Sequence, residues 1–265
     1  MHTKTFCVAI LLLAGAVAVR ADDWNKTYNV SGKPEIRVEL DDGSIHASGG
    51  GKGEVRAVVS TCGWKIGPDE VRVEEHQNGN RIEISVRVPR GLHVLIFGCR
   101  SVTVELTVPT ETDLDLHSKD GRISVADVKG SERLNSGDGR IEVNGMDGSL
   151  KADTRDGRVT VDGRFDVLSV HTGDVRIEAS VRPGSKLASG WALRTRDGRV
   201  ELRLPLDIAA DLDAHTGDGK IVSDFPVTMS GSSTSDSRSV RGRLNGGGPI
   251  LEIRTGDGSV HISKY

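Results

Sequence analysis

The sequence predicts an all-β fold: a β-solenoid or β-helix-like stack of two-strand rungs of about 18 residues, with an antiparallel hairpin region near its N-terminus. Three observations predict it. An Asp-Gly-Arg motif or a close variant recurs along the second half of the chain. Apolar and hydroxyl residues keep fixed places around each copy. Aromatic residues are only 3% of the chain while glycine is 33 of 265 residues, which favours thin, repetitive packing over a thick core.

The repeated aspartates are separated by 18, 18, 18, 23, 21 and 39 residues, so four copies share one period and later copies carry insertions. Ser or Thr lies two residues before each Asp, and apolar residues lie four before and three after it. This alternation predicts two short strands, each with one buried face, joined at a corner. The corners are expected at Asp120-Gly121, Asp138-Gly139, Asp156-Gly157, Asp174-Val175, Asp197-Gly198, Asp218-Gly219 and Asp257-Gly258.

The corner residues are predicted to be architectural. Glycine tolerates a positive φ and Asp can bond its own backbone, which suits a turn. The Ser or Thr of each copy is expected to satisfy backbone groups of the turn. Val175 replaces the glycine in one copy, and a β-branched residue disfavours positive φ. We therefore expect local strain or a different turn there.

Residues 1–21 are predicted to be a signal peptide, because Lys4 precedes an apolar run that ends before Asp22. Residues 22–110 should form a β region continuous with the solenoid. It contains an early copy of the corner at 40–47, a hairpin around Asn78-Gly79 within 70–89, and a strand over 101–109. Residues 111–265 should form rungs with a second turn near 129–130 and 147–148, and inserted loops at 181–190 and 226–249. The pattern leaves the handedness of the coil open.

An exported chain keeps two cysteines, Cys62 and Cys99, which most simply form a disulfide in an oxidising compartment. Two buried free thiols are the alternative. Loss of the leader would change the formal net charge from −3 to about −5, which argues against nucleic-acid binding. No other segment is apolar enough to span a membrane. The expected location is the periplasm, the cell surface or the extracellular space.

The repeat predicts no metal, cofactor or catalytic residue. Calcium-binding β-rolls need shorter repeats, and here a cation follows the glycine, which is the wrong charge beside a metal. Glycan cleavage needs one convergent set of acids, whereas these aspartates lie one to a rung. His117, His171 and His215 share an outward column but should not lie on adjacent rungs, so shared metal ligation is not expected.

The column two residues after each Asp is the candidate site. It should face outward as a strip that could bind an anionic glycan or lipid head group. The alternative is a solvated ion ladder with the neighbouring Asp column, in which each exposed pair contributes about 0–1 kcal/mol. The strip consists of Arg122, Arg140, Arg158, Arg176, Arg199 and Lys220.

The repeated (S/T)-x-D-G-(R/K/S)-(I/V)-x-(V/A) pattern over roughly residues 35–263 resembles a bacterial β-strand-repeat family of unknown function, the putative adhesins also called toast-rack domains. The closing GGGPILEIRTGDGSVHI and the DFPV segment add to the resemblance, and the cysteine pair and Val175 depart from it. It implies an exported β-solenoid-like domain without established enzyme activity and with no binding residues to carry over.

The sequence therefore favours a non-enzymatic exported envelope protein that acts as an adhesion or interaction module. The alternative is an envelope sensory or regulatory domain that binds a peptide, lipid or anionic glycan and reports to a membrane partner. A polysaccharide-active β-helix enzyme comes third.

Overall fold

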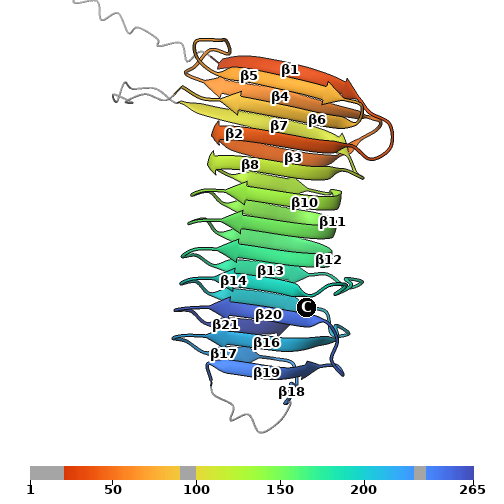
Figure 1. Cartoon of the computed structure of the whole chain (residues 1–265), viewed down its shortest axis with the longest axis vertical. Coiled ribbons are helices and arrows are strands. Elements are labelled where there is room, and N and C mark those ends of the chain that lie inside the picture. The colour runs from red at the N-terminus through yellow and green to blue at the C-terminus, as the bar shows by residue number, and fades with distance from the viewer. Residues whose placement is uncertain (1–20, 90–99, 230–236) are drawn as a thin grey trace, which may run out of the picture.

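The chain forms a tall stack of β-strands (Figure 1), here as a computed structural model that describes residues 21–89, 100–229 and 237–265. The described residues contain no helix, and the predicted all-β stack of two-strand rungs is confirmed. Apart from Ala21, the predicted signal peptide lies outside the described residues. None of the described residues belongs to a helix that could span a membrane.

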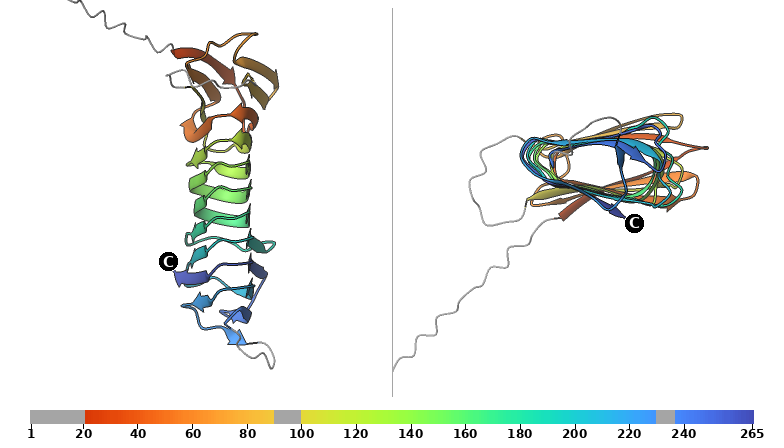
Figure 2. Two further views of the ribbon diagram at one scale, coloured as in Figure 1. Left: turned by 90° about the vertical axis from the view of Figure 1, so that its left-hand side faces the viewer. Right: turned by 90° about the horizontal axis from the view of Figure 1, so that it is seen from below.

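Each rung contributes one strand to each of two facing layers, so the chain traces a flattened ring when seen along the stack (Figure 2). The first layer runs, in order of pairing, through β5 (Arg72–Asn78), β6 (Arg81–Arg87), β2 (Glu35–Asp42), β8 (Asp113–Asp120), β10 (Lys129–Ser136), β11 (Ile141–Thr154), β12 (Val159–Thr172), β14 (Trp191–Thr195), β20 (Ile250–Thr255), β16 (Ala210–Thr216), β19 (Ser239–Leu244) and β18 (Thr228–Met229).

The second layer faces the first across the core. It runs through β1 (Ala21–Asn29), β4 (Glu54–Cys62), β7 (Ser101–Pro109), β3 (Ser44–Gly51), β9 (Ile123–Ala126), β11, β12, β13 (Ile177–Val181), β15 (Val200–Leu204), β21 (Val260–Lys264) and β17 (Ile221–Ser223). β11 and β12 each serve both layers. The turn predicted near 147–148, opposite the Asp corners, therefore lies inside β11 and does not separate two strands. At residues 147–148 the chain bends within a continuous strand, with register shifts before Met146 and after Gly148.

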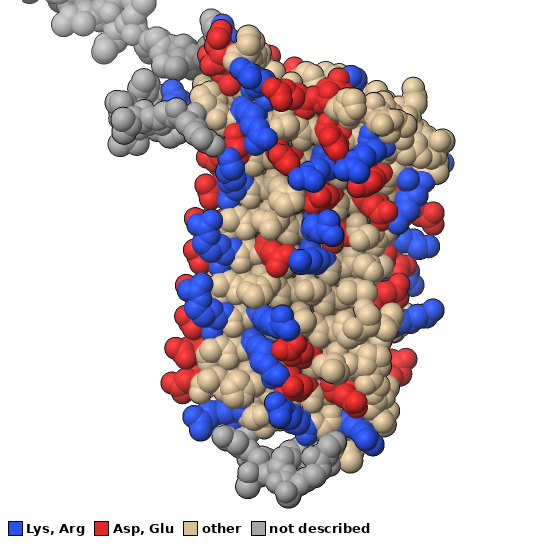
Figure 3. Space-filling view, viewed as in Figure 1, with Lys and Arg blue, Asp and Glu red and all other residues tan. Residues whose placement is uncertain are grey.

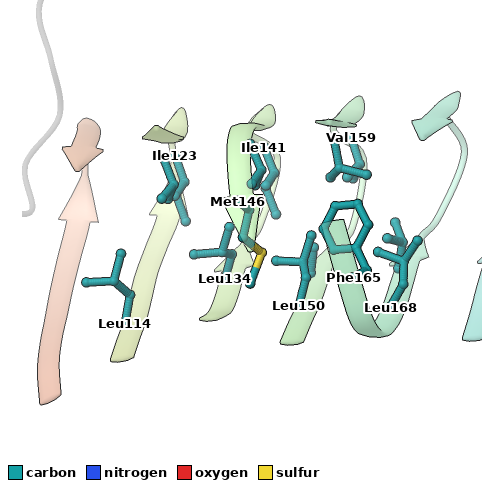
Figure 4. Close-up of a cluster of buried hydrophobic side chains, with 14 of the residues drawn as sticks. Leu114, Ile123, Leu134, Ile141, Met146, Leu150, Val159, Phe165 and Leu168 are labelled. Atoms are coloured by element: carbon teal, nitrogen blue, oxygen red, sulfur yellow. The ribbon is translucent and has the colours of Figure 1, made fainter. Parts of the chain in front are cut away.

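The core is built from columns of like residues, because parallel in-register rungs place each apolar residue on its counterpart. Leu114, Leu150 and Leu168 project from the first layer toward Ile123, Ile141 and Val159 of the second (Figure 4). All six are at most 2% exposed. Burial of such a side chain contributes about 1.5–3 kcal/mol, so a rung is stable only when its neighbours cover both of its edges.

At the N-terminal end, chain order and spatial order differ. β2 and β3 form the first rung, and the chain then leaves for β4 to β7 before it returns to β8. The first rung therefore lies between β6–β7 and β8–β9. Antiparallel strands β5, β4 and β1 close this end. The predicted hairpin is confirmed, with Gly79 at φ 59° as in a type II′ turn.

The C-terminal end repeats this arrangement. The last rung, β20 and β21, lies between β14–β15 and β16–β17 and not at the end of the stack. The loop predicted over 226–249 is wrong in part, since β19 lies within it and pairs antiparallel with β16. β19 covers an edge of β16 and buries Gly242 and Leu244. The Ser- and Gly-rich composition of the segment concealed this strand in the sequence. Residues 182–190 join β13 to β14 without a strand.

Candidate functional site

Seven Asp-containing turns of the predicted repeat lie one above another along one edge of the stack, which we name the Asp corner, and the early copy at Asp42-Gly43 lies next to the first of them. From the N-terminal side its aspartates are Asp120, Asp138, Asp156, Asp174, Asp197, Asp257 and Asp218. All seven are exposed. Asp257 comes before Asp218 because the C-terminal rung is inserted, an order that the sequence does not reveal. Figure 3 shows basic and acidic side chains following each other down its left-hand edge, where this corner lies.

A column of buried hydroxyl groups holds the Asp corner together, as predicted. Ser136 donates to the carbonyl oxygen of Gly121 (2.9 Å), Thr154 to that of Gly139 (3.1 Å) and Thr172 to that of Gly157 (3.1 Å). Thr195, Thr255, Thr216 and Ser118 repeat the contact on their own rungs. Each hydroxyl links its own rung to the corner of the neighbouring rung, and these hydrogen bonds hold the backbone that carries the charged side chains.

The predicted reason for the corner glycines is wrong at six of the corners. The glycines that follow Asp120, Asp138, Asp156, Asp197, Asp218 and Asp257 have no positive φ, whereas Gly43 of the early copy does, at 137°. The rungs instead approach so closely that a side chain has no room. A Cβ added at Gly157 would lie 1.6 Å from the carbonyl oxygen of Gly139, and one at Gly139 would lie 1.7 Å from that of Gly121. Close backbone stacking therefore selects glycine here.

The expectation of strain at Val175 through positive φ is also wrong. Val175 is not in the left-handed region, and its carbonyl oxygen accepts the Thr195 hydroxyl at 3.1 Å, as a corner glycine's carbonyl does elsewhere. The following corner glycine, Gly198, stacks on that carbonyl as closely as the others do on theirs. The substitution leaves the corner intact.

The predicted Arg strip is continuous over five rungs and then interrupted. Each arginine directly precedes one of five consecutive strands of the second layer, and the five are Arg122, Arg140, Arg158, Arg176 and Arg199. Ser259 of the inserted rung comes next and accepts a hydrogen bond from Arg199, so Lys220 is one rung further away. Whether the strip binds a ligand stays a prediction.

Glutamates two residues further along the chain neutralise half of the strip. Arg140 pairs with Glu142 (3.3 Å), Arg176 with Glu178 (3.2 Å) and Arg199 with Glu201 (3.5 Å). Ser124 and Thr160 take the place of the glutamate after Arg122 and Arg158. Arg122, Arg158 and Lys220 therefore have no acidic partner within the described ranges.

Sequence reasoning missed a second basic column, which directly precedes the aspartates. It alternates long cations with glycine, as Lys119, Gly137, Arg155, Gly173 and Arg196. Arg155 extends to Asp138 of the preceding rung (3.7 Å) and Arg196 to Asp174 (3.6 Å). Lys119 pairs with Asp41 in the same manner. Comparing every second copy of the repeat would have shown this column.

Ion pairs, most of them between neighbouring strands, surround both inserted rungs. At the C-terminal end Arg254 contacts Asp213 through two nitrogens (2.7 and 2.9 Å), and Arg194 reaches Glu252 (2.6 Å). The hydrogen bond from Arg254 lowers the pKa of Asp213. At the N-terminal end Arg37 and Arg87 both contact Glu39, whose pKa is lowered mainly by its hydrogen bond to Arg37.

One carboxyl group lies inside the core. Glu132 is 2% exposed and occupies the same column as Leu114 and Leu150. Neither of its carboxylate oxygens has a hydrogen-bond partner. Burial raises the pKa of Glu132 from 4.5 to about 8. Glu132 does not line any of the four hollows formed by described residues within 37–87, 39–155, 33–166 and 185–249.

Two polar hollows mark the N-terminal half of the first layer. The larger, about 510 Å³, lies at the Asp corner over Gly137, between Lys119 and Arg155. The other, about 440 Å³, is lined by side chains of β2, β5 and β6. Both have mixed charge, and no single pair of acids stands apart in either. Nowhere in the described parts of the chain do three or more His, Cys, Asp or Glu side chains form a group that could hold a metal ion.

The histidines of the shared column are spread along the stack. His117, His171 and His215 lie on β8, β12 and β16, which do not neighbour one another, as expected. Cys62 ends β4 opposite Ser101. Cys99 lies outside the described residues, so the Cys62–Cys99 disulfide stays a prediction.

No family model matches the chain, and no curated protein does. Several solved structures align loosely with the chain. A putative adhesin from Bacteroides fragilis aligns at 12% identity and TM-score 0.44, over 92% of this chain and 97% of that one. A putative adhesin from Parabacteroides merdae aligns at 8% and 0.41, over 91% and 96%. A putative cell adhesion protein from Clostridium sporogenes aligns at 11% and 0.38, over 92% and 100%. At these scores the likeness gives no information on a ligand or partner.

Proposed function

We propose that this chain is an exported, non-enzymatic interaction module of the bacterial envelope and that it binds its partner through the Asp corner. The observation that supports this most is the regular repetition of exposed charge on every rung, carried by a buried column of hydroxyl groups. Such a surface is long and its charged groups recur at a regular spacing. It suits recognition of an extended partner more than turnover of a small substrate.

The same repetition argues against a polysaccharide-active enzyme. General acid–base catalysis on a sugar needs two carboxyl groups with different environments at one place. The corner aspartates are all exposed and stand in equivalent positions. Neither polar hollow distinguishes one pair of acids from the others.

An anionic glycan or lipid head group is one candidate partner. Its support is the pair Arg122 and Arg158, exposed guanidinium groups without an acidic neighbour in the described structure. Binding to glycan and lipid arrays should fall when both are reversed, Arg122→Glu with Arg158→Glu. The paired Arg140 and Arg176 serve as the matched control, because Glu142 and Glu178 already neutralise them. Equal loss in both variants would argue against these two residues.

Location separates adhesion from the alternative, an envelope sensory domain. Cell fractionation and surface labelling should place an adhesion module outside the cell. Retention in the periplasm together with a co-purifying membrane protein would favour sensing. Export also predicts that Cys62 and Cys99 resist alkylation until they are reduced, and free thiols in the native exported protein would contradict the disulfide.

A further inference from the structure

The Asp corner alternates in charge with a period of two rungs. In two rungs a single carboxylate lies between two cations: Lys119, Asp120 and Arg122 in one, Arg155, Asp156 and Arg158 in the other. We name these the basic rungs, and the three named residues of each have one net positive charge. Lys119 also pairs with Asp41 of the preceding rung, but its side chain is more than half exposed. Between and after them lie the acidic rungs, in which one arginine accompanies two carboxylates. Their residues are Asp138, Arg140 and Glu142, then Asp174, Arg176 and Glu178.

These four rungs are neighbours in space as well as in sequence. β9, β11, β12 and β13 pair in register one after another, so the order along the corner is basic, acidic, basic, acidic. Neighbouring strands are about 4.8 Å apart, so like rungs recur about every 10 Å. The contact of Arg155 with Asp138 is long, 3.7 Å, and both side chains are more than half exposed, so these charges remain accessible to a partner.

This order is complementary to itself. A two-fold axis across the stack, between the second and third of the four rungs, brings the first rung of one copy against the fourth of another. The second then meets the third. Every basic rung faces an acidic rung, which is the isologous contact expected of a symmetric dimer. A polyanion would instead meet an exposed aspartate on every rung, including Asp120 and Asp156.

We propose that the partner at the Asp corner is a second copy of this chain, bound side by side and antiparallel. This rests on the proposed function, because it names the partner of the same surface. The four rungs span only about 15–20 Å, and the buried area falls well below the roughly 1,200 Å² of stable interfaces. The contact is therefore weak for one pair and becomes strong when many copies are displayed together.

Beads coated with the exported protein test the proposal, because display converts a weak contact into visible clumping. Wild-type beads clump at about 0.01 M ionic strength and disperse at about 1 M. Arg122→Glu with Arg158→Glu makes all four rungs net negative, and Glu142→Arg with Glu178→Arg makes them all net positive. Each double variant alone loses clumping by about tenfold or more, and a mixture of the two variants clumps again.

The matched control is Arg133→Glu with Lys151→Glu, which changes the net charge by the same amount on β10 and β11 but away from the corner. It should clump as wild type, and thermal unfolding checks that every variant is folded. Failure of the mixed variants to clump overturns the proposal. Dispersed wild-type beads that bind an acidic glycan through Arg122 and Arg158 overturn it too, but leave the proposed function standing. If wild-type beads neither clump nor bind an acidic glycan, the proposed contact between copies and the proposed function are both contradicted.

Discussion

In the middle of the stack each rung lies on the rung that precedes it in the chain, whereas at both ends a rung is inserted out of order. The middle rungs depend on close backbone approach at glycine and on the hydroxyl column. Their ion pairs join either residues two apart along one rung, such as Arg140 with Glu142, or neighbouring rungs, such as Arg155 with Asp138. The inserted rungs are flanked by ion pairs that cross strands, such as Arg254 with Asp213. Chain order is sufficient to bring neighbours together in the middle, while side-chain pairing contributes to the choice of neighbour at the ends.

The largest expected effect tests the close approach in the middle. Gly157→Ala should destabilise the fold by more than about 3 kcal/mol, because its Cβ would collide with backbone and not with a movable side chain. Gly217→Ala, between β16 and β17 at the end of the stack, should cost much less, since its Cβ would lie 3.0 Å from the nearest atom. Gly67→Ala has open space and is the control. Urea unfolding of the three variants measures the difference, and equal losses at 157 and 217 would contradict it.

The next effect concerns Glu132, a carboxyl group that lies in the buried column between Leu114 and Leu150. Because the folded pKa of Glu132 is raised from 4.5 to about 8, its stability contribution is complete below the lower value and lost as pH rises through the higher one. At pH 7 the cost is on the order of 3 kcal/mol. Glu132→Leu should restore the leucine column, raise stability by a comparable amount and flatten the pH dependence between about pH 5 and 8. Glu132→Gln, which keeps a buried polar group, should flatten it with a smaller gain.

A smaller effect separates the two kinds of ion pair. Asp213→Asn should lower stability by about 1 kcal/mol, because its contact with Arg254 is bidentate and cross-strand but partly exposed. Glu142→Gln in the middle should change almost nothing. The lowered pKa of Asp213 means that its contribution is present above its ordinary value of 3.8 and lost as pH falls through the folded value. Hydrogen exchange of β20 measures the effect, and equal exchange in both variants would remove the distinction.

The smallest effect concerns Val175. Val175→Gly restores the repeat motif, but the wild-type residue is outside the left-handed region and keeps the corner contact with Thr195. Glycine should therefore only add flexibility to the unfolded chain and lower stability by about 0.5–1 kcal/mol. Denaturant unfolding compares the two proteins. A gain in stability would mean that valine strains the corner after all.

Much of the site could be predicted from the sequence, because each repeat carries its own evidence. The spacing of Asp120, Asp138 and Asp156 predicted the corner, and the preceding Ser or Thr predicted the hydrogen-bonded column beneath it. The role of the glycines could not be predicted in the same way. Whether a glycine serves a positive φ or a close neighbour depends on what lies above it, and only the stacked rungs show the carbonyl oxygen in contact.

The sequence by itself determined the rung, its two strands, its corner and the columns that face the core, because period-two alternation and like-on-like stacking are local properties of each repeat. Only the tertiary structure decided which rungs are neighbours at the two ends. Any rung offers nearly the same backbone edges and apolar columns to any other, so the repeat cannot specify order where the chain doubles back. The insertion of β2–β3 and β20–β21 depends on connections and cross-strand charges that lie far apart in the chain, such as Asp213 and Arg254.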